Sequence, residues 1–233
     1  MNTTQLLLDF EYRPALKAED FLVAPCNSDA VAWIDRWPDW PTPAFFLQGP
    51  AGSGKSHLAQ VFQTMANIVP ITAIELIQKD PPALLTGVRA CLLDDLDKAF
   101  DKNDRNELEV ALLHLYNTVR EVGATMMMTG RVPPSRWQLQ LADLSSRLKT
   151  ATVAEIGPPD DALLAAVLVK QFADRQLKVD GDVVAFVQLR IERSFVALGQ
   201  LVDAVDKMAM VEKRRITVPL VRQVLHNLNK TDE

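Results

Sequence analysis

The sequence predicts an α/β protein: a core with a five-stranded parallel sheet, followed by a small all-helical domain. Two observations lead to this prediction. Short apolar runs alternate with helical patterns as far as residue 156, and this alternation builds a parallel sheet that is covered by helices on both faces. After Gly157-Pro158-Pro159 the helical patterns continue without another strand. Because paired prolines interrupt regular structure, we place a domain boundary there.

The first strand-like run, residues 44–47, leads into a glycine-rich loop and then a helical pattern. Residues 49–56 fill every fixed position of the phosphate-binding pattern G-x-x-x-x-G-K-[ST]. Glycines let successive N–H groups point at phosphate oxygens, the lysine reaches the terminal phosphates, and the hydroxyl after it binds Mg²⁺. The alternative is a glycine-rich turn with an incidental lysine, which the flanking strand and helix disfavour. We expect ADP or ATP with Mg²⁺ to contact Gly49, Pro50, Ala51, Gly52, Ser53, Gly54, Lys55, Ser56 and His57.

Four more strands are expected after this loop, because short apolar runs recur between helical patterns. A helix over residues 106–122 has apolar residues on one face. The three consecutive methionines of the fourth strand indicate a buried strand rather than a metal or cofactor site. The four strands are expected at residues 70–74, 90–94, 125–129 and 151–156.

The C-terminal part shows four helical segments, near residues 160–176, 182–192, 195–213 and 217–228. We therefore expect three regions along the chain. They are an N-terminal peptide and linker at 1–17, an α/β nucleotide-binding core at 18–157, and a helical domain at 158–233.

Two acidic residues, Asp94 and Asp95, end the third expected strand. A buried strand tolerates paired carboxylates only at its edge, where Mg²⁺ can neutralise them. Asp94 is then a metal ligand together with Ser56, and Asp95 can polarise an attacking water. The alternative is the start of a surface loop. Thr129 ends the fourth strand, and its hydroxyl either faces the terminal phosphate and the water or bonds to the backbone.

Arg147 lies just before the fifth expected strand, in the segment Asp143-Leu144-Ser145-Ser146-Arg147-Leu148. Its position alone allows two interpretations. It is either a solvated surface charge or an arginine finger, which acts in trans on a nucleotide bound by a neighbouring protein.

An apolar cluster lies within the first ten residues: Gln5, Leu6, Leu8 and Phe10. Terminal residues are usually polar and loose unless something holds them. The cluster is therefore either an edge strand on the core or an exposed peptide that anchors in a partner's apolar pocket.

Composition narrows the classes of function. The 233 residues carry a net charge of −5 and a pI near 5.3, which argues against general electrostatic attraction to DNA. Cys91 lies in an apolar run and is expected to be a buried free thiol. With no membrane-spanning stretch and no signal peptide pattern, we expect a cytoplasmic protein.

Taken together, these motifs resemble the AAA+ family, and within it the nucleotide-binding portion of the replication initiator DnaA and its short regulatory relatives. Residues 49–56 resemble the Walker A motif and residues 92–95 the Walker B motif with its Asp-Asp ending. Residues 129–134 look like the sensor-1 segment, and residues 141–148 are similar to the segment that carries the arginine finger. The helical domain corresponds to the family's lid.

The resemblance implies a mechanism and partners. The short relatives begin with a peptide of pattern Q-x-x-L-x-F, which Gln5, Leu8 and Phe10 match and which docks on the β sliding clamp of DNA polymerase III. Held there, the protein would present Arg147 to ATP bound by DnaA, promote its hydrolysis and so inhibit initiation. DnaA's further DNA-binding domain has no counterpart before Glu233, so no sequence-specific DNA binding is expected.

One departure concerns the lid. Val196 stands where the DnaA relatives carry a sensor-2 arginine, and Arg193 is the nearest substitute on the same side of a helix. Whether Arg193 replaces that arginine stays open, as do self-association into a homodimer and the choice between ADP and ATP. We therefore expect an activator of a partner's ATPase with little or no ATPase of its own; an autonomous ATPase or loader is the alternative.

Overall fold

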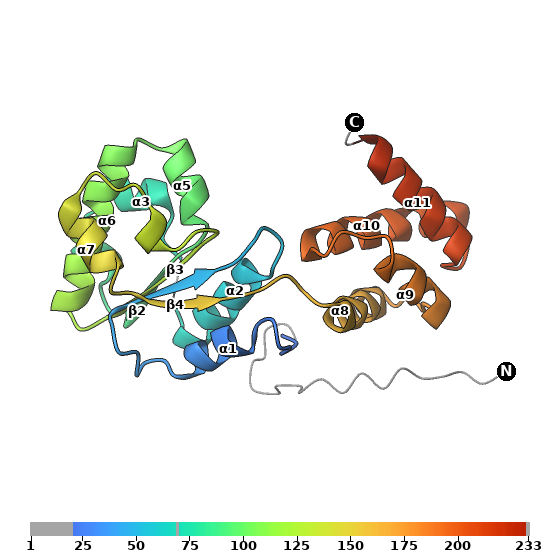
Figure 1. Ribbon diagram of the computed structural model, residues 1–233, viewed down its shortest axis with the longest axis horizontal. Helices are drawn as coiled ribbons and strands as arrows, with labels where there is room; N and C mark the ends of the chain where they lie inside the picture. The colour runs from blue at the N-terminus through green and yellow to red at the C-terminus, as the bar shows by residue number, and fades with distance from the viewer. Residues whose placement is uncertain (1–20, 69, 232–233) are drawn as a thin grey trace. The chain divides into compact units, whose positions relative to one another are not determined.

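The computed structural model describes residues 21–68 and 70–231, which form two compact units that divide between Gly157 and Pro158 (Figure 1). The first unit is an α/β core, and the second is all helical. The expected clamp-binding peptide, with Gln5, Leu6, Leu8 and Phe10, lies outside the described residues.

The core contains a four-stranded sheet in the order β2-β3-β1-β4, and all its strand pairs are parallel. The carboxyl ends of all four strands therefore meet at one edge of the sheet, where ligands of such folds bind. The strands are β1 (Ala44–Gln48), β2 (Ala90–Leu93), β3 (Thr125–Gly130) and β4 (Thr152–Glu155).

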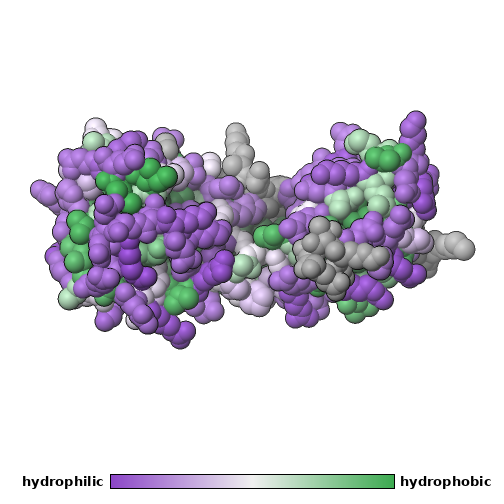
Figure 2. Space-filling model, turned by 90° about the horizontal axis from the view of Figure 1, so that it is seen from above, coloured by the Kyte–Doolittle hydropathy of each residue, from purple (hydrophilic) through white to green (hydrophobic). Residues whose placement is uncertain are grey.

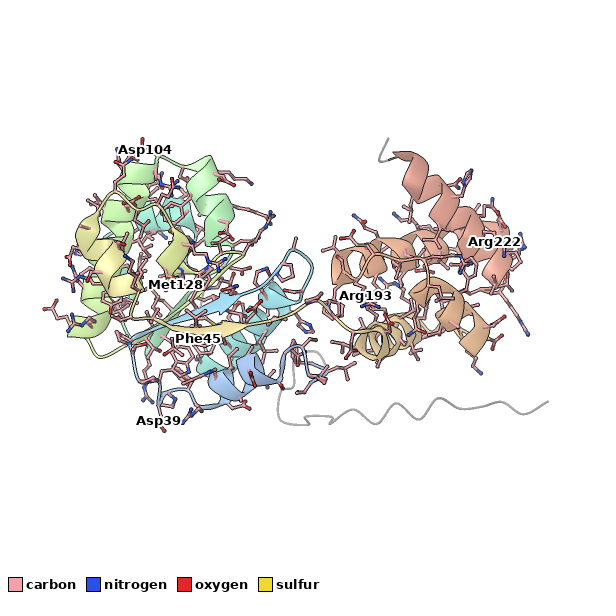
Figure 3. The ribbon with its side chains drawn as sticks, viewed as in Figure 1. Asp39, Phe45, Asp104, Met128, Arg193 and Arg222 are labelled. Atoms are coloured by element: carbon pink, nitrogen blue, oxygen red, sulfur yellow. The ribbon has the colours of Figure 1, made fainter. Side chains whose placement is uncertain are left out.

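Helices cover both faces of this sheet (Figure 1). Alternate side chains of a strand point to opposite faces, so Phe45 packs with α1 and α2, while Phe46 packs with α3, α6 and α7. Phe45 and Met128 are fully buried within these layers (Figure 3). The core helices are α1 (Ser28–Asp35), α2 (Lys55–Ala66), α3 (Ala73–Gln78), α4 (Pro81–Leu84), α5 (Leu96–Lys102), α6 (Arg105–Glu121) and α7 (Ala142–Leu148), with a short 3₁₀ helix η1 (Pro134–Arg136).

The prediction of five strands was wrong, because the sheet has four. The expected strand at residues 70–74 is reduced to one parallel bridge between Pro70 and Leu92, with the Ile71 N–H donating to the Leu92 carbonyl at 2.8 Å. Thr72 then caps α3: its Oγ1 accepts from the Glu75 N–H at 3.2 Å, and the Glu75 carboxylate accepts from the Thr72 N–H at 3.1 Å. This reciprocal capping box starts a helix where a strand was expected.

The other predicted core elements are present. The expected helix at 106–122 is α6, and the three methionines lie in β3 with no exposed surface. Cys91 is a buried free cysteine in β2, and burial raises the pKa of its thiol to about 12. It therefore behaves as a small apolar core residue rather than a nucleophile.

The helical unit has its own apolar core, built by inward-facing residues from all four of its helices, among them Phe172 and Val202. Hydrophilic residues cover most of the visible surface of each unit (Figure 2). Across the described residues, no helix is long and apolar enough to cross a membrane. The helices are α8 (Asp161–Asp174), α9 (Gly181–Gln188), α10 (Phe195–Glu212) and α11 (Val218–Thr231).

Candidate functional site

The glycine-rich loop joins the carboxyl end of β1 to the first residue of α2. Gly52 and Gly54 have φ of 71° and 96°, a left-handed conformation that favours glycine. At Gly49 a Cβ would lie 2.5 Å from the Ile156 carbonyl oxygen and 2.7 Å from Ser53 Oγ. The loop thus needs glycine at these positions, and it ends at a helix whose N-cap, Gly54, makes no side-chain cap bond. That leaves the first N–H groups of α2 for another acceptor.

Lys55 is folded against the loop that precedes it. Its ammonium donates to the carbonyl oxygens of Gly49 and Pro50, both at 2.8 Å, and the residue is only 6% exposed. Burial lowers the pKa of Lys55, and the nearby carboxylates, Asp95 foremost, oppose that shift. The lysine is therefore held at the phosphate loop.

The loop also contains a polar atom that could bind a phosphate group. Ser53 Oγ is buried and makes no hydrogen bond to any described residue. Such an atom needs a polar partner, and a phosphate oxygen can accept from it. Ser56 and His57 follow in the first turn of α2, and the His57 ring meets Phe21 edge to face at 5.2 Å between centroids.

Thr129 connects the two acidic residues that follow β2. Its buried Oγ1 donates to Asp94 Oδ1 at 2.5 Å and accepts from the Asp95 N–H at 2.8 Å. The neighbouring parallel strands β2 and β3 end side by side, which brings the three residues together. The bond from the Asp95 N–H agrees with the interpretation in which the hydroxyl bonds to the backbone, whereas the bond to the Asp94 carboxylate was in neither interpretation of the sequence.

Two contacts around this acidic pair were not predicted. Lys98 pairs with the Asp95 carboxylate from the next turn of α5, and the Asp97 carboxylate accepts from the Arg131 N–H. Asp95 adopts a left-handed φ of 56° as the N-cap of α5. The sequence signal for Lys98 was its place in a run of mixed charges, which resembled an ordinary solvated surface.

Oxygen atoms are available for Mg²⁺ at this edge of the sheet. Within the described ranges, no group of three or more His, Cys, Asp or Glu side chains could hold a metal ion by itself. Mg²⁺ beside a nucleotide needs only one or two protein ligands, since phosphate and water oxygens complete its shell. The hydroxyl of Ser56 and the carboxylate of Asp94 suit that role.

The helix α7, which carries Arg147, lies at the opposite edge of the sheet from the start of α2, where the phosphate loop ends (Figure 1). Arg147 lies in the last turn of α7, which leads into the amino end of β4, where Thr152 pairs with Phe45. The phosphate loop instead follows Gln48, at the carboxyl end of β1. The structure therefore does not bring Arg147 together with the residues expected to hold this chain's own nucleotide.

The Arg147 guanidinium is held by two side chains. It donates to both carboxylate oxygens of Asp143, at 2.9 and 3.0 Å, and its Cζ lies 5.8 Å from the centre of the Tyr116 ring. The hydrogen bonds that it donates to Asp143 raise the pKa of Arg147. Its side chain keeps 27% of its surface exposed, so an oriented cation is presented at this edge.

In the helical unit, Val196 is 58% exposed in the first turn of α10. Arg193 precedes that helix and pairs with Asp161 at 3.0 Å. Ser194, the helix N-cap, and Phe195 lie between Arg193 and Val196 in the chain, and Arg193 is labelled in Figure 3. The exposed pair is weak enough for Arg193 to exchange partners.

Comparisons with known proteins agree with this architecture. Residues 160–225 match the family described as "Hda, lid domain". An uncharacterized protein from Haemophilus influenzae is 27% identical over 196 residues, which are 81% of this chain and 84% of that protein.

Among solved structures, domain III of the Thermotoga maritima replication initiation protein DnaA is similar, with a TM-score of 0.76 at 18% identity over 93% of this chain and 98% of that one. AMPPCP-bound DnaA from Aquifex aeolicus gives 0.68 at 17% identity, over 94% and 71%. The chain thus shares the α/β fold of these DnaA structures, with four strands in its sheet, and its helical unit matches the Hda lid family over residues 160–225.

Proposed function

We propose that this protein, DnaA-related in fold and Hda-type in its lid, is a negative regulator of DNA replication initiation. In this proposal it acts in the cytoplasm, binds ADP or ATP with Mg²⁺, and docks on the β sliding clamp through Gln5, Leu6, Leu8 and Phe10. There it stimulates hydrolysis of ATP bound to DnaA, with Arg147 as the arginine finger.

The observation that carries this proposal is the position of Arg147. The residue is carried by α7, which leads into the amino end of β4, whereas the phosphate loop follows the carboxyl end of β1. An arginine so far from its own chain's nucleotide can serve a nucleotide on a neighbouring molecule. Its planar guanidinium offers five donors that suit phosphate oxygens, and it can stabilise the charge that develops during phosphoryl transfer.

The protein's own nucleotide has a structural part in this proposal. Lys55, the Ser53 hydroxyl and the N–H groups at the start of α2 would bind its phosphates, and Ser56 and Asp94 would bind Mg²⁺. Bound Mg²⁺ neutralises phosphate charge. Asp95, with Thr129 bonded to its N–H, would orient a water at this site. Nucleotide binding would thereby fix the loops at the carboxyl edge of the sheet.

The test is a reconstituted assay of ATP bound to DnaA, with DNA-loaded clamp and this protein. Arginine fingers contribute roughly 10³- to 10⁵-fold to the rate, so Arg147→Ala should remove nearly all of the stimulation while clamp and nucleotide binding persist. Lys149→Ala, an exposed cation two residues away, is the matched control and should stimulate normally. If Arg147→Ala stimulated hydrolysis of DnaA-bound ATP as well as the unchanged protein does, the proposed role of Arg147 would be wrong.

A second arm tests the clamp. Deletion of residues 1–10 should abolish stimulation on loaded clamp and should leave nucleotide binding unchanged. Full stimulation by the shortened protein would show that the peptide is dispensable.

The second candidate function is an autonomous ATPase or loader that remodels a replication protein. The hydrogen bonds of Thr129 to Asp94 and Asp95 favour it, since they organise the acidic pair beside the chain's own phosphate loop. Steady-state turnover of the isolated protein, with and without Lys55→Ala, separates the two functions. Turnover that depends on Lys55 supports an autonomous ATPase, and its absence leaves the partner's site as the place of hydrolysis.

A further inference from the structure

Glu109 is an acidic residue inside the core. It lies on α6 with no exposed surface, next to the apolar residues Leu108 and Leu112. Charged side chains are almost never fully buried unless they are paired. Its partners therefore indicate why a carboxylate is kept at this position.

The partners are backbone groups at the start of α7. Glu109 Oε2 accepts hydrogen bonds from the N–H groups of Gln140 and Leu141, at 2.8 and 2.9 Å. Leu141 is the N-cap of α7 and supplies no side-chain cap bond. Glu109 thus satisfies, from another helix, two donors at the point where the chain turns into α7.

The second oxygen is oriented toward a cation. Glu109 Oε1 has no hydrogen-bond partner among the described residues, and Arg105 Nε lies 3.5 Å away as an ion pair. Arg105 is one helical turn earlier on α6, and its guanidinium also lies 5.2 Å from the Phe100 ring centre. The carboxylate is therefore held from both sides.

The same face of α6 contacts the other end of α7. Tyr116 follows Glu109 by seven residues, which is about two helical turns, and its ring lies 5.8 Å from Arg147 Cζ. Leu144 and Leu148 anchor the apolar side of α7 in the core that Leu112 shares. The helix α6 thus fixes the start of α7 and also provides the surface that the Arg147 guanidinium contacts.

We propose that Glu109 is a positioning residue for Arg147: its buried carboxylate fixes the start of α7 and, through this short helix, the place of the guanidinium. This inference rests on the proposed function for the role of Arg147 in hydrolysis. The new element is that the role of Arg147 depends on Glu109, a buried residue that contacts neither the nucleotide nor the partner. The sequence signal was an acidic residue beside the apolar stripe of the helix at 106–122.

The experiment compares Glu109→Gln and Glu109→Leu with Glu107→Gln. Glu107 lies on the same helix two residues earlier and is exposed, so it is the matched control. The Gln variant keeps an acceptor without the charge, whereas the Leu variant has no acceptor. Because a misplacement of about 1 Å can cost roughly 10²-fold in rate, we expect maximal stimulation of DnaA-bound ATP hydrolysis to fall about 10²-fold in Glu109→Leu and less in Glu109→Gln. The concentration for half-maximal stimulation and the affinity for ADP should stay unchanged.

A second readout does not depend on hydrolysis. The NMR signal of the Arg147 Nε–Hε group, assigned by its loss in Arg147→Ala, should shift in Glu109→Gln and not in Glu107→Gln. This measurement remains decisive if Glu109→Leu fails to fold.

The outcomes separate the two proposals. If Arg147→Ala stimulates normally, the proposed function fails, while the NMR comparison still tests the positioning. A folded Glu109→Gln variant with the Arg147 signal and the stimulated rate of the unchanged protein would overturn the role of Glu109.

Discussion

At the residue scale, Thr129 illustrates which parts of the site could be predicted from sequence. Asp94, Asp95 and Thr129 each end an apolar run, so their common edge was predictable. The partner of the Thr129 hydroxyl was not, since it depends on the register of β2 and β3, where Leu93 pairs with Met128. Residues within the continuous loop at 49–56 were predictable for the opposite reason, because one motif contains them all. Contacts between residues of different motifs could be identified only from the structure, because the pairing of the strands brings those residues together.

Lys98 gives a prediction at this scale. Its ammonium pairs with Asp95 at the surface, so it competes with any water that the carboxylate would orient. Exposed pairs contribute about 0.2 to 1 kcal/mol. We therefore expect Lys98→Ala to raise the protein's own nucleotide turnover by at most about fivefold.

The measurement is steady-state release of phosphate, with the turnover of Lys55→Ala subtracted as background. Lys102→Ala, on the same helix and exposed, is the control and should leave the rate unchanged. A fall in turnover with Lys98→Ala would instead indicate that the lysine assists Asp95.

At the element scale, the expected second strand shows how a local signal overrides an apolar run. Residues 70–74 have the composition of a strand, yet Thr72 and Glu75 form the S/T-x-x-E pattern of a capping box. That pattern was visible in the sequence and predicts a helix start within the run. Pro70 also lacks an N–H for the sheet. The pattern is not sufficient by itself, because Thr152 and Glu155 have the same spacing and lie in the strand β4.

The capping box leads to the second prediction. Loss of a Thr N-cap costs about 1 kcal/mol, so Thr72→Ala should lower the free energy of unfolding by about that amount, measured by urea denaturation. The bond from Lys79, and then those from the Thr72 N–H and hydroxyl, lower the pKa of Glu75 from its usual 4.5 to about 2.

The sign of the pH dependence follows from that shift. A carboxylate whose pKa is lower in the folded state stabilises the protein above its unfolded pKa, and this stabilisation is lost as pH falls. The cost of Thr72→Ala should therefore be full at pH 6 and should shrink between about pH 4.5 and pH 2. Thr64→Ala, an exposed threonine on α2, should show no such trend, and a cost that is independent of pH would contradict the role of the ionised cap.

At the scale of the whole molecule, two separate apolar cores account for the two units. The change from alternating strands and helices to helices alone predicted their division near Gly157-Pro158-Pro159, and the structure divides between Gly157 and Pro158. The strand order β2-β3-β1-β4 could not be predicted from the alternation of strands and helices along the sequence, because many different orders of parallel strands have the same alternation. That order places β1 between β3 and β4. The common direction of the strands sets Arg147, which lies before β4, at their amino ends, and the phosphate loop, which follows β1, at their carboxyl ends.

Separate cores predict separate unfolding. Phe172 is 1% exposed in the core of the helical unit, and truncation of a buried Phe to Ala costs about 3 to 5 kcal/mol through lost burial and the remaining cavity. Phe172→Ala should therefore accelerate hydrogen exchange throughout α8 to α11 while β1 and β3 keep their protection, because cooperative units open independently. Val211→Ala, at an 82% exposed position of the same unit, should change exchange little. If β1 and β3 lost protection together with α8 to α11, the two units would unfold as one cooperative structure, and the stability of the helical unit could not change without that of the α/β core.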